Sequence, residues 1–175
     1  MFLALYTVYS KTKKGYAQIA LYFGIAGTVV YFATNTSFSM LSLSMQYASA
    51  TTEEQRNLIS AAGQAMLSLN RFSDAISYPG TGGLLSILFV GISGFINSLL
   101  MLESLSFKRF TGIIGILANG LDILYCMLFL FLPAIDHRVL SIGLIPIAGL
   151  FAMIWHIWVG VKLFQHARQN NQLIV

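Results

Sequence analysis

The sequence is poor in charged residues and has a single cysteine. Charged side chains make up 9 % of the 175 residues and hydrophobic ones 57 %, with a mean hydropathy of +0.75. A soluble domain carries about 25 % charged residues, so the composition excludes an ordinary globular protein, a disordered chain and a nucleic-acid-binding protein. Cys126 alone can form neither a disulfide framework nor a cysteine-based zinc site. The composition predicts an integral membrane protein whose main partner is the lipid bilayer.

Four apolar segments are long enough to cross a membrane. A spanning helix needs about 20 mainly apolar residues, and the segments that qualify are 16–34, 82–102, 110–132 and 140–163. Each is continuously apolar rather than alternating, which excludes barrel strands. We therefore predict an all-α polytopic fold, in which four transmembrane helices form a bundle and residues 1–175 form a single membrane domain.

Basic residues gather on one side of the membrane if the four spans alternate in direction. They lie before the first span, between the second and third, and after the fourth, whereas the opposite side is roughly neutral. Basic residues beside spans are retained in the cytoplasm, so we expect a cell-membrane protein with both termini cytoplasmic. The same residues could also attract anionic lipid headgroups. They are Lys11, Lys13, Lys14, Lys108, Arg109, Lys162 and Arg168.

Small residues recur at helical spacing within the spans, where they let helix backbones approach closely. We expect these stripes to face the inside of the bundle, with a dimer contact as the alternative. They are Ala20, Gly24 and Thr28 in the first span, Gly94 and Ser98 in the second, Gly112 and Gly115 in the third, and Ala148 and Ala152 in the fourth.

The first 15 residues open with an apolar run that is too short to span. It has neither the basic start nor the small-residue cleavage site of a signal peptide. Two interpretations stay open, namely a helix lying along the inner leaflet and the tail of a truncated spanning helix.

Residues 35–80 form the one long connection outside the membrane, and we expect them to be helical. Thr51 and Glu54 have the spacing of a capping box, in which Thr51 accepts from the Glu54 amide while Glu54 reaches back. An amphipathic stripe follows. Its apolar positions are Leu58, Ile59, Ala62, Ala65, Met66 and Leu69.

A second apolar stripe precedes the capping box, at Phe38, Leu41, Met45 and Ala48. An antiparallel helical hairpin above the outer surface would bury both stripes. The alternative is a helix that rests on the lipid headgroups. We call residues 37–78 the outer cap, and expect Thr51, Glu54, Leu58 and Met66 to be among its structural positions.

Few strongly polar side chains lie within the spans. Asn97, Asn119, Asp122 and His156 could meet at one depth of the bundle. A charged Asp at mid-membrane costs about 2.5–3.5 kcal/mol, so Asp122 should face the interior and be paired. One interpretation is a proton or ion relay or a small-ligand pocket. The other is a buried hydrogen-bond cluster that holds the bundle together.

The sequence contains no pattern typical of an enzyme or of a cofactor site. It has no Gly-rich phosphate loop, no HExxH and no paired acidic motif. His137 falls in a short outer loop and His166 beyond the last span, so neither can join His156 in a bis-histidine site. We expect no enzymatic activity, no metal and no cofactor.

Three stretches carry a resemblance to a known family. They are LSLSMQYASATTEEQRNLISAAGQAML at 41–67, LESLSFKRFTGIIGILANGLDILY at 102–125 and IWVGVKLF at 157–164. In this order they resemble a family of small polytopic bacterial and archaeal membrane proteins known only as a domain of unknown function. The resemblance spans roughly Phe2 to Phe164. Full-length members have about six helices, which implies that FLALYTVY corresponds to the end of an earlier helix. No activity or site residue is implied.

Two functions remain. The first is a non-enzymatic accessory or scaffold subunit of a larger membrane complex, with the outer cap as the surface that binds other membrane subunits. The alternative is a small transporter or ligand- or proton-binding bundle that uses Asn97, Asn119, Asp122 and His156. Convergence of these four side chains on a cavity would favour the alternative.

Overall fold

The computed structural model describes residues 1–69, 81–104, 107–132 and 137–172, and every regular element in these ranges is a helix. The all-α prediction is therefore confirmed for this part of the chain. The helices are α1 (Phe2–Tyr9), α2 (Lys14–Thr34), α3 (Ser37–Ser49), α4 (Glu53–Leu69), α5 (Thr81–Glu103), α6 (Arg109–Phe131) and α7 (His137–Gln172).

The prediction of four membrane-spanning helices is also confirmed. Apolar stretches of sufficient length lie in α2, α5, α6 and α7, and the first continues through α3 to Ser49. Helix α7 has 36 residues, about 54 Å at 1.5 Å per residue, whereas the hydrocarbon core is about 30 Å thick. Part of α7 therefore extends beyond the membrane.

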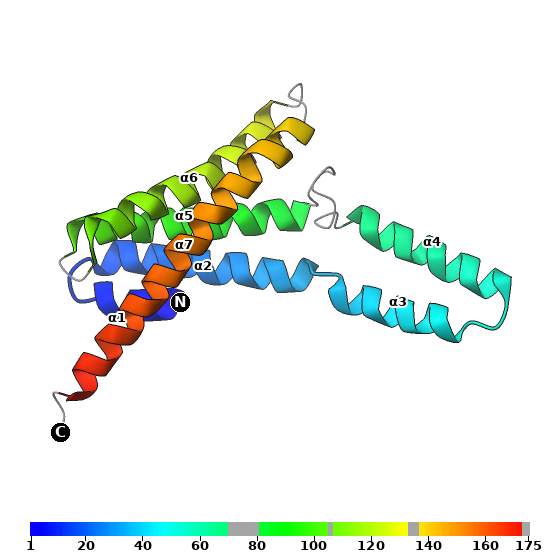
Figure 1. The fold of residues 1–175 in the computed structure, drawn as a ribbon, viewed down its shortest axis with the longest axis horizontal. Coiled ribbons are helices and arrows are strands. Elements are labelled where there is room, and N and C mark those ends of the chain that lie inside the picture. The colour runs from blue at the N-terminus through cyan, green and yellow to red at the C-terminus, as the bar shows by residue number, and fades with distance from the viewer. Residues whose placement is uncertain (70–80, 105–106, 133–136, 173–175) are drawn as a thin grey trace.

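The spans pack side by side in the order α2, α5, α6 and α7 (Figure 1). Helix α7 crosses the others diagonally and contacts mainly α6. Its membrane face is consequently open, with Ile142, Ile147, Leu150 and Met153 more than half exposed. Side chains of this kind suit contact with lipid tails, which are as apolar as they are.

Small residues set how closely the spans approach. Helix α2 buries Ala17, Ala20, Gly24 and Gly27 against α5 and α1. A Cβ atom at Gly27 would lie 2.8 Å from a methyl group of Val90, so only glycine fits there. The predicted stripe was right at Ala20 and Gly24.

The prediction that Thr28 belongs to the buried stripe was wrong. Thr28 is exposed and donates its hydroxyl hydrogen to the Gly24 carbonyl. Gly27 takes its place, because a 3.6-residue helical period admits either neighbour. In the other spans Gly94, Ser98, Gly112, Gly115 and Ala148 are buried as predicted, and Ala152 is half-buried.

Helix α1 packs lengthwise against α2. Leu5 and Tyr9 are buried in the same apolar cluster as Trp155 of α7. At the other end of α1, the Phe2 ring lies against Gly24, about 15 Å along α2 from its first residue at 1.5 Å per residue. This placement is that of a helix running beside a span, and not of one lying flat along the inner leaflet.

Candidate functional site

The described part of the outer cap is a helical hairpin that projects from the spans. Helices α3 and α4 pack on each other and extend away beyond the end of α2 (Figure 1). A short break separates α2 from α3, where the Ser37 amide donates to the Asn35 side chain. We call residues 37–69 the α3–α4 hairpin.

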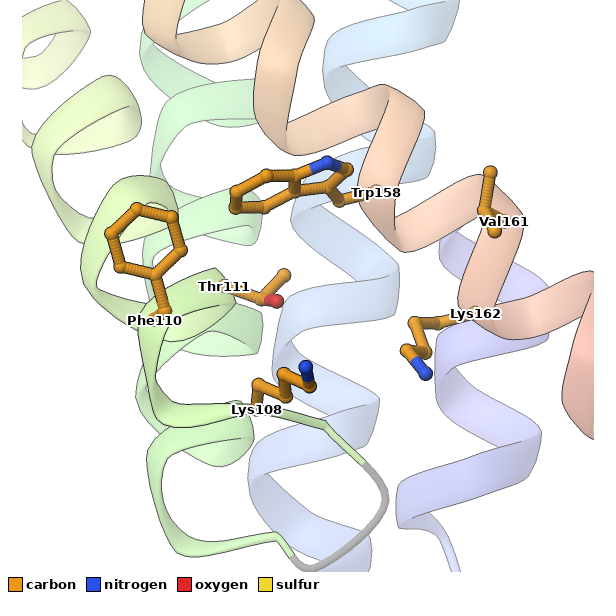
Figure 2. A pocket seen from close by; sticks show the side chains of 6 residues that line it. All are labelled: Lys108, Phe110, Thr111, Trp158, Val161 and Lys162. Atoms are coloured by element: carbon orange, nitrogen blue, oxygen red, sulfur yellow. The ribbon is translucent and has the colours of Figure 1, made fainter.

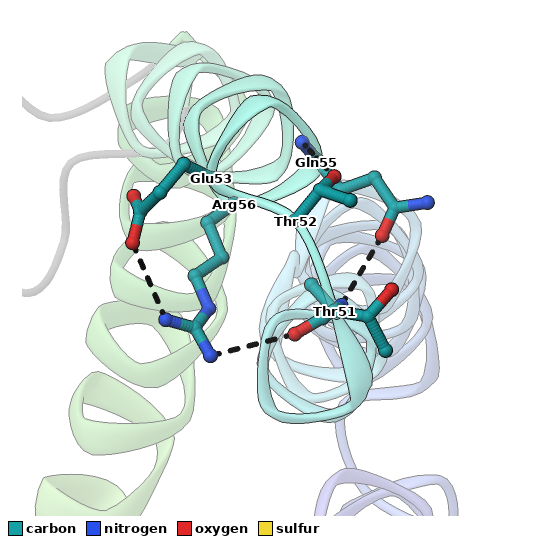
Figure 3. Close-up of polar contacts among 6 residues, drawn as sticks. Thr51, Thr52, Glu53, Gln55 and Arg56 are labelled. Carbon is teal, nitrogen blue, oxygen red and sulfur yellow. Dashed lines mark hydrogen bonds and ion pairs between the residues drawn. The ribbon is translucent and has the colours of Figure 1, made fainter.

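The tip of the hairpin is held by polar contacts (Figure 3). The Gln55 amide donates to the Thr52 hydroxyl, and the Thr51 amide donates to the Gln55 side chain, each at 3.3 Å. The Arg56 guanidinium bridges the Glu53 carboxylate and the Ala50 carbonyl. These contacts fix the start of α4.

The predicted capping box was wrong by one residue. Thr52 and Gln55 take the roles expected of Thr51 and Glu54, and Glu54 is exposed. The sequence TTEEQ offers two overlapping Thr-x-x-Glu/Gln pairs. The pair that is used places both acids in the first turn of α4, where the helix dipole favours negative charge.

The inside of the hairpin differs from the predicted stripes. Met40 and Leu43 of α3 are half-buried, as are Ile59 and Met66 of α4, and the Met40 methyl group lies beside Gly63. The hairpin was predicted to bury Phe38, Leu41, Met45 and Leu58, and this was wrong. Those side chains are 85 %, 59 %, 67 % and 72 % exposed, respectively.

Helix α3 therefore has an uncovered apolar stripe. Phe38, Leu41 and Met45 recur at spacings of three and four residues, so they share one face of the helix. No charged residue occurs between Ser37 and Ser49. A contiguous apolar surface on a helix without charge is typical of a contact surface rather than of one that faces water. We call these three residues the α3 stripe.

The predicted intramembrane polar residues lie on facing helices, and each amide bonds its own helix. Asn97 donates to the Ser93 carbonyl and Asn119 donates to the Gly115 carbonyl, one turn back in each case. Asn97 and Asn119 are buried, and the Asn119 amide lies directly against Gly94. Asp122 is half-buried and its Cβ lies near Gly91.

His156 does not join these residues. It is exposed, and its Nδ1 atom lies 2.7 Å from the Ala152 carbonyl of its own helix. Trp155, the residue before it, faces inward and lies against Gly115 instead. Among the hydrogen bonds of residues 81–104, 107–132 and 137–172, none joins two of the four predicted residues. Asn119 packs α6 against α5 at Gly94, but the four residues form no hydrogen-bonded cluster and bring no acid and base to one point.

A third feature is a pocket at the opposite end of the spans from the hairpin (Figure 2). It has a volume of about 350 Å³ and lies between the start of α6 and the C-terminal half of α7. We call it the inner pocket. The sequence-based predictions did not include it, although Trp158 and Lys162 stand one turn apart on α7, as do Lys108 and Thr111 at the start of α6. Its lining residues are Lys108, Phe110, Thr111, Trp158, Val161 and Lys162.

Fold and composition together define a class, namely helical membrane proteins with four spans and a projecting helical hairpin. The family model described as "Domain of unknown function (DUF4386)" matches residues 1–163, so the chain belongs to that family. The resemblance found in the sequence is thereby confirmed. No curated protein and no solved structure matches the chain significantly.

Proposed function

We propose that this chain is a non-enzymatic accessory or scaffold subunit of a larger membrane complex, and that the α3 stripe binds its partner. The observation that carries the proposal is the exposure of Phe38, Leu41 and Met45 on a hairpin that projects from the spans. The partner we infer is an apolar helix of another membrane protein on the same side of the bilayer. Helices of this kind pack through residues at spacings of three and four.

Two features of α3 support a helix as the partner. Serines flank the stripe at positions 39, 42 and 44, and small residues allow a second helix to approach closely. The charges of the hairpin are confined to its tip, at Glu53, Glu54 and Arg56. The partner therefore needs no charge opposite the stripe itself.

The proposal includes an orientation. The four spans return the chain to the side from which it entered, and that side has seven basic residues and one acid, Glu103. Basic residues beside spans stay in the cytoplasm. We therefore place the protein in the cell membrane with the α1–α2 turn and the C-terminus in the cytoplasm and the hairpin outside. The expected cytoplasmic position of the N-terminus does not fit α1, whose Phe2 ring lies beside Gly24 within the length of the span.

The transporter alternative has less support from the contacts. It needs Asp122 and His156 near each other, whereas His156 is exposed on α7 and bonded within its own turn. We expect His156→Ala to change neither the amount of folded protein nor the activity of the assembled complex. A strong loss of activity with unchanged folding would favour the relay instead.

The test is site-specific photo-crosslinking in native membranes. A photoreactive residue at position 41 should give one protein adduct of discrete mass, in stoichiometric yield. The matched control is position 64, since Gln64 is also exposed on the hairpin but belongs to α4. We expect little or no adduct from that position.

A second arm tests the stripe itself. Phe38→Ser combined with Met45→Ser should reduce the position-41 adduct by at least about tenfold, because two buried apolar contacts of roughly 1.5–3 kcal/mol each are removed. Adducts with lipid alone would contradict the proposal and favour a helix resting on the headgroups. Equal protein adducts from positions 41 and 64 would also contradict it.

A further inference from the structure

We propose that the inner pocket binds the phosphate group of an anionic phospholipid. This inference is independent of the proposed function, because it concerns the opposite end of the spans. The pocket combines positive charge without a carboxylate partner, the hydroxyl group of a buried threonine, a helix start and an aromatic wall, and each of these features supports an anionic ligand.

The positive charge comes from two lysines on different helices. Lys108 precedes α6 and Lys162 lies on α7, and their side chains extend toward each other from opposite sides of the pocket (Figure 2). The ion pairs among the described residues are Lys13 with Glu103 and Arg56 with Glu53, so neither pocket lysine has a carboxylate partner there. Lys162 donates one hydrogen bond, to the Gln165 side chain at 3.1 Å. Two of its three ammonium protons remain for an anion.

Thr111 supplies a hydroxyl group to the same pocket. Its side chain is only 4 % exposed, lines the pocket, and makes no hydrogen bond within the described part of the chain. In Figure 2 it points from α6 into the pocket, below the Trp158 ring. A hydroxyl group that lines the pocket can donate its proton to a phosphate oxygen.

The pocket lies at the start of α6, which no side chain caps. The Thr111 amide donates to the Lys108 carbonyl, but the amides before it have no intrahelical acceptor, and the positive end of the helix dipole adds to their attraction for an anion. The lysines and the helix start therefore favour the same negatively charged group. A phosphodiester carries one such charge and several acceptor oxygens.

The aromatic wall indicates that the phosphate belongs to a lipid. The Phe110 and Trp158 rings pack with centroids 5.1 Å apart, and they are 56 % and 39 % exposed. Val161 beside them is 49 % exposed. Phe110 lies at the start of the third span, directly after Lys108 and Arg109, and aromatic and basic residues are both typical of the headgroup region. A lipid can place its phosphate between the lysines and its acyl chains along the rings, and basic pockets between spans bind headgroups in this way.

The experiment uses tryptophan fluorescence of the full chain in lipid nanodiscs. The chain has two tryptophans, of which Trp158 lines the pocket and Trp155 is buried in the protein. Phosphatidylglycerol and phosphatidylcholine with brominated acyl chains are compared as quenchers. Each lysine near the membrane surface strengthens anionic lipid binding about fivefold, so we expect a preference for phosphatidylglycerol of about 25-fold.

Three variants locate the site. Lys108→Gln with Lys162→Gln should reduce the preference to near unity. The matched control, Lys11→Gln with Lys14→Gln, removes two exposed charges from the same side but outside the pocket, and should keep most of the preference. Trp158→Phe should abolish the difference in fluorescence quenching between the two brominated lipids.

Four outcomes would overturn the proposal. Equal quenching by the two lipids in the unaltered chain would overturn it, and so would equal losses in the two double-lysine variants, because binding would then be diffuse. A preference that persists in Trp158→Phe would place the lipid elsewhere. Displacement of the quencher by millimolar inorganic phosphate or glycerophosphate would assign the pocket to a soluble phosphate instead of a lipid.

Discussion

The α5–α6 interface and the α3–α4 hairpin are both contacts between two helices, but they are built in opposite ways. Between α5 and α6, glycines meet side chains so closely that an added Cβ would overlap the Asn119 amide at Gly94 and the Ser98 hydroxyl at Gly115. Within the hairpin, the nearest side-chain atom to a Cβ at Gly63 is 4.0 Å away. The first interface has no free space, and the second has room.

The difference follows from the solvent that each region meets. In lipid no hydrophobic effect drives spans together, so stability depends on close packing and hydrogen bonds. The hairpin lies beyond the end of α2 and can rely on apolar contacts such as that of Met40 with Gly63, yet it leaves the α3 stripe uncovered. One region is closed by its own contacts, while the other leaves an apolar face exposed.

The largest effect should come from the tightest glycine. We expect Gly94→Ala to lower the free energy of unfolding by roughly 2–4 kcal/mol, because the new methyl group must displace the Asn119 amide inside a packed interface. The measurement is thermal or denaturant-induced unfolding in detergent. Gly149→Ala is the matched control, since nothing lies within 4 Å of a Cβ there. Similar losses in both variants would contradict the argument.

The next effect concerns the hydroxyl groups that join α5 to α2. Ser93 donates to the Ala20 carbonyl and Ser86 donates to the Gly27 carbonyl, and both serines are buried. We expect Ser93→Ala to lower the free energy of unfolding by about 0.6–1 kcal/mol, the usual contribution of a hydrogen bond between spans. Ser98→Ala removes a bond within one helix and should cost less. A reversed order in unfolding experiments would show that these bonds do not hold the helices together.

The location of the spans could be predicted from the sequence, but the direction in which their side chains face could not. Length and hydropathy suffice to place four helices in a membrane. They leave rotation about the helix axis open, because a span that is apolar all around has little amphipathic signal. Thr28 was therefore predicted on the face that Gly27 occupies, and His156 was grouped with Asn119 although it faces outward.

The hairpin shows the same limit in its own packing. Helix α3 has apolar residues on two faces, at Met40 and Leu43 and at the α3 stripe, and either face could have packed on α4. The choice depends on the partner helix, where Gly63 of α4 lies beside the Met40 methyl group. Periodicity in one helix cannot reveal that contact.

A substitution in the hairpin should stabilise the protein slightly. Gly63→Ala places a methyl group in open space beside Met40 and removes the flexibility of a mid-helix glycine. The free energy of unfolding of α4 should therefore rise by about 0.5–1 kcal/mol. Hydrogen exchange of the α4 amides measures the gain locally. If Gly63→Ala raises the free energy of unfolding and Gly94→Ala lowers it, the contrast between the two interfaces is sharpened. If both substitutions lower the free energy of unfolding, the contrast disappears.

The smallest effect concerns the ion pair at the other end of the spans. The Lys13 ammonium lies 2.7 Å from the Glu103 carboxylate, and both side chains are substantially exposed. The hydrogen bond to Glu103, together with its negative charge, raises the pKa of Lys13 above the ordinary value. Because the pKa is raised in the folded state, the stabilisation is fully present below the unfolded pKa of about 10.4, and is lost as the pH rises through the folded value.

We therefore expect Glu103→Gln to reduce the melting temperature slightly at pH 7, and the difference from the unaltered chain to shrink at high pH and in concentrated salt, since exposed pairs are screened. Thermal unfolding of both proteins across this pH range is the measurement. Lys11→Gln removes an exposed lysine that forms no ion pair among the described residues, and it should show no such pH dependence. A Glu103→Gln difference that persists at high pH would mean that Glu103 acts through packing and not through the charge of Lys13.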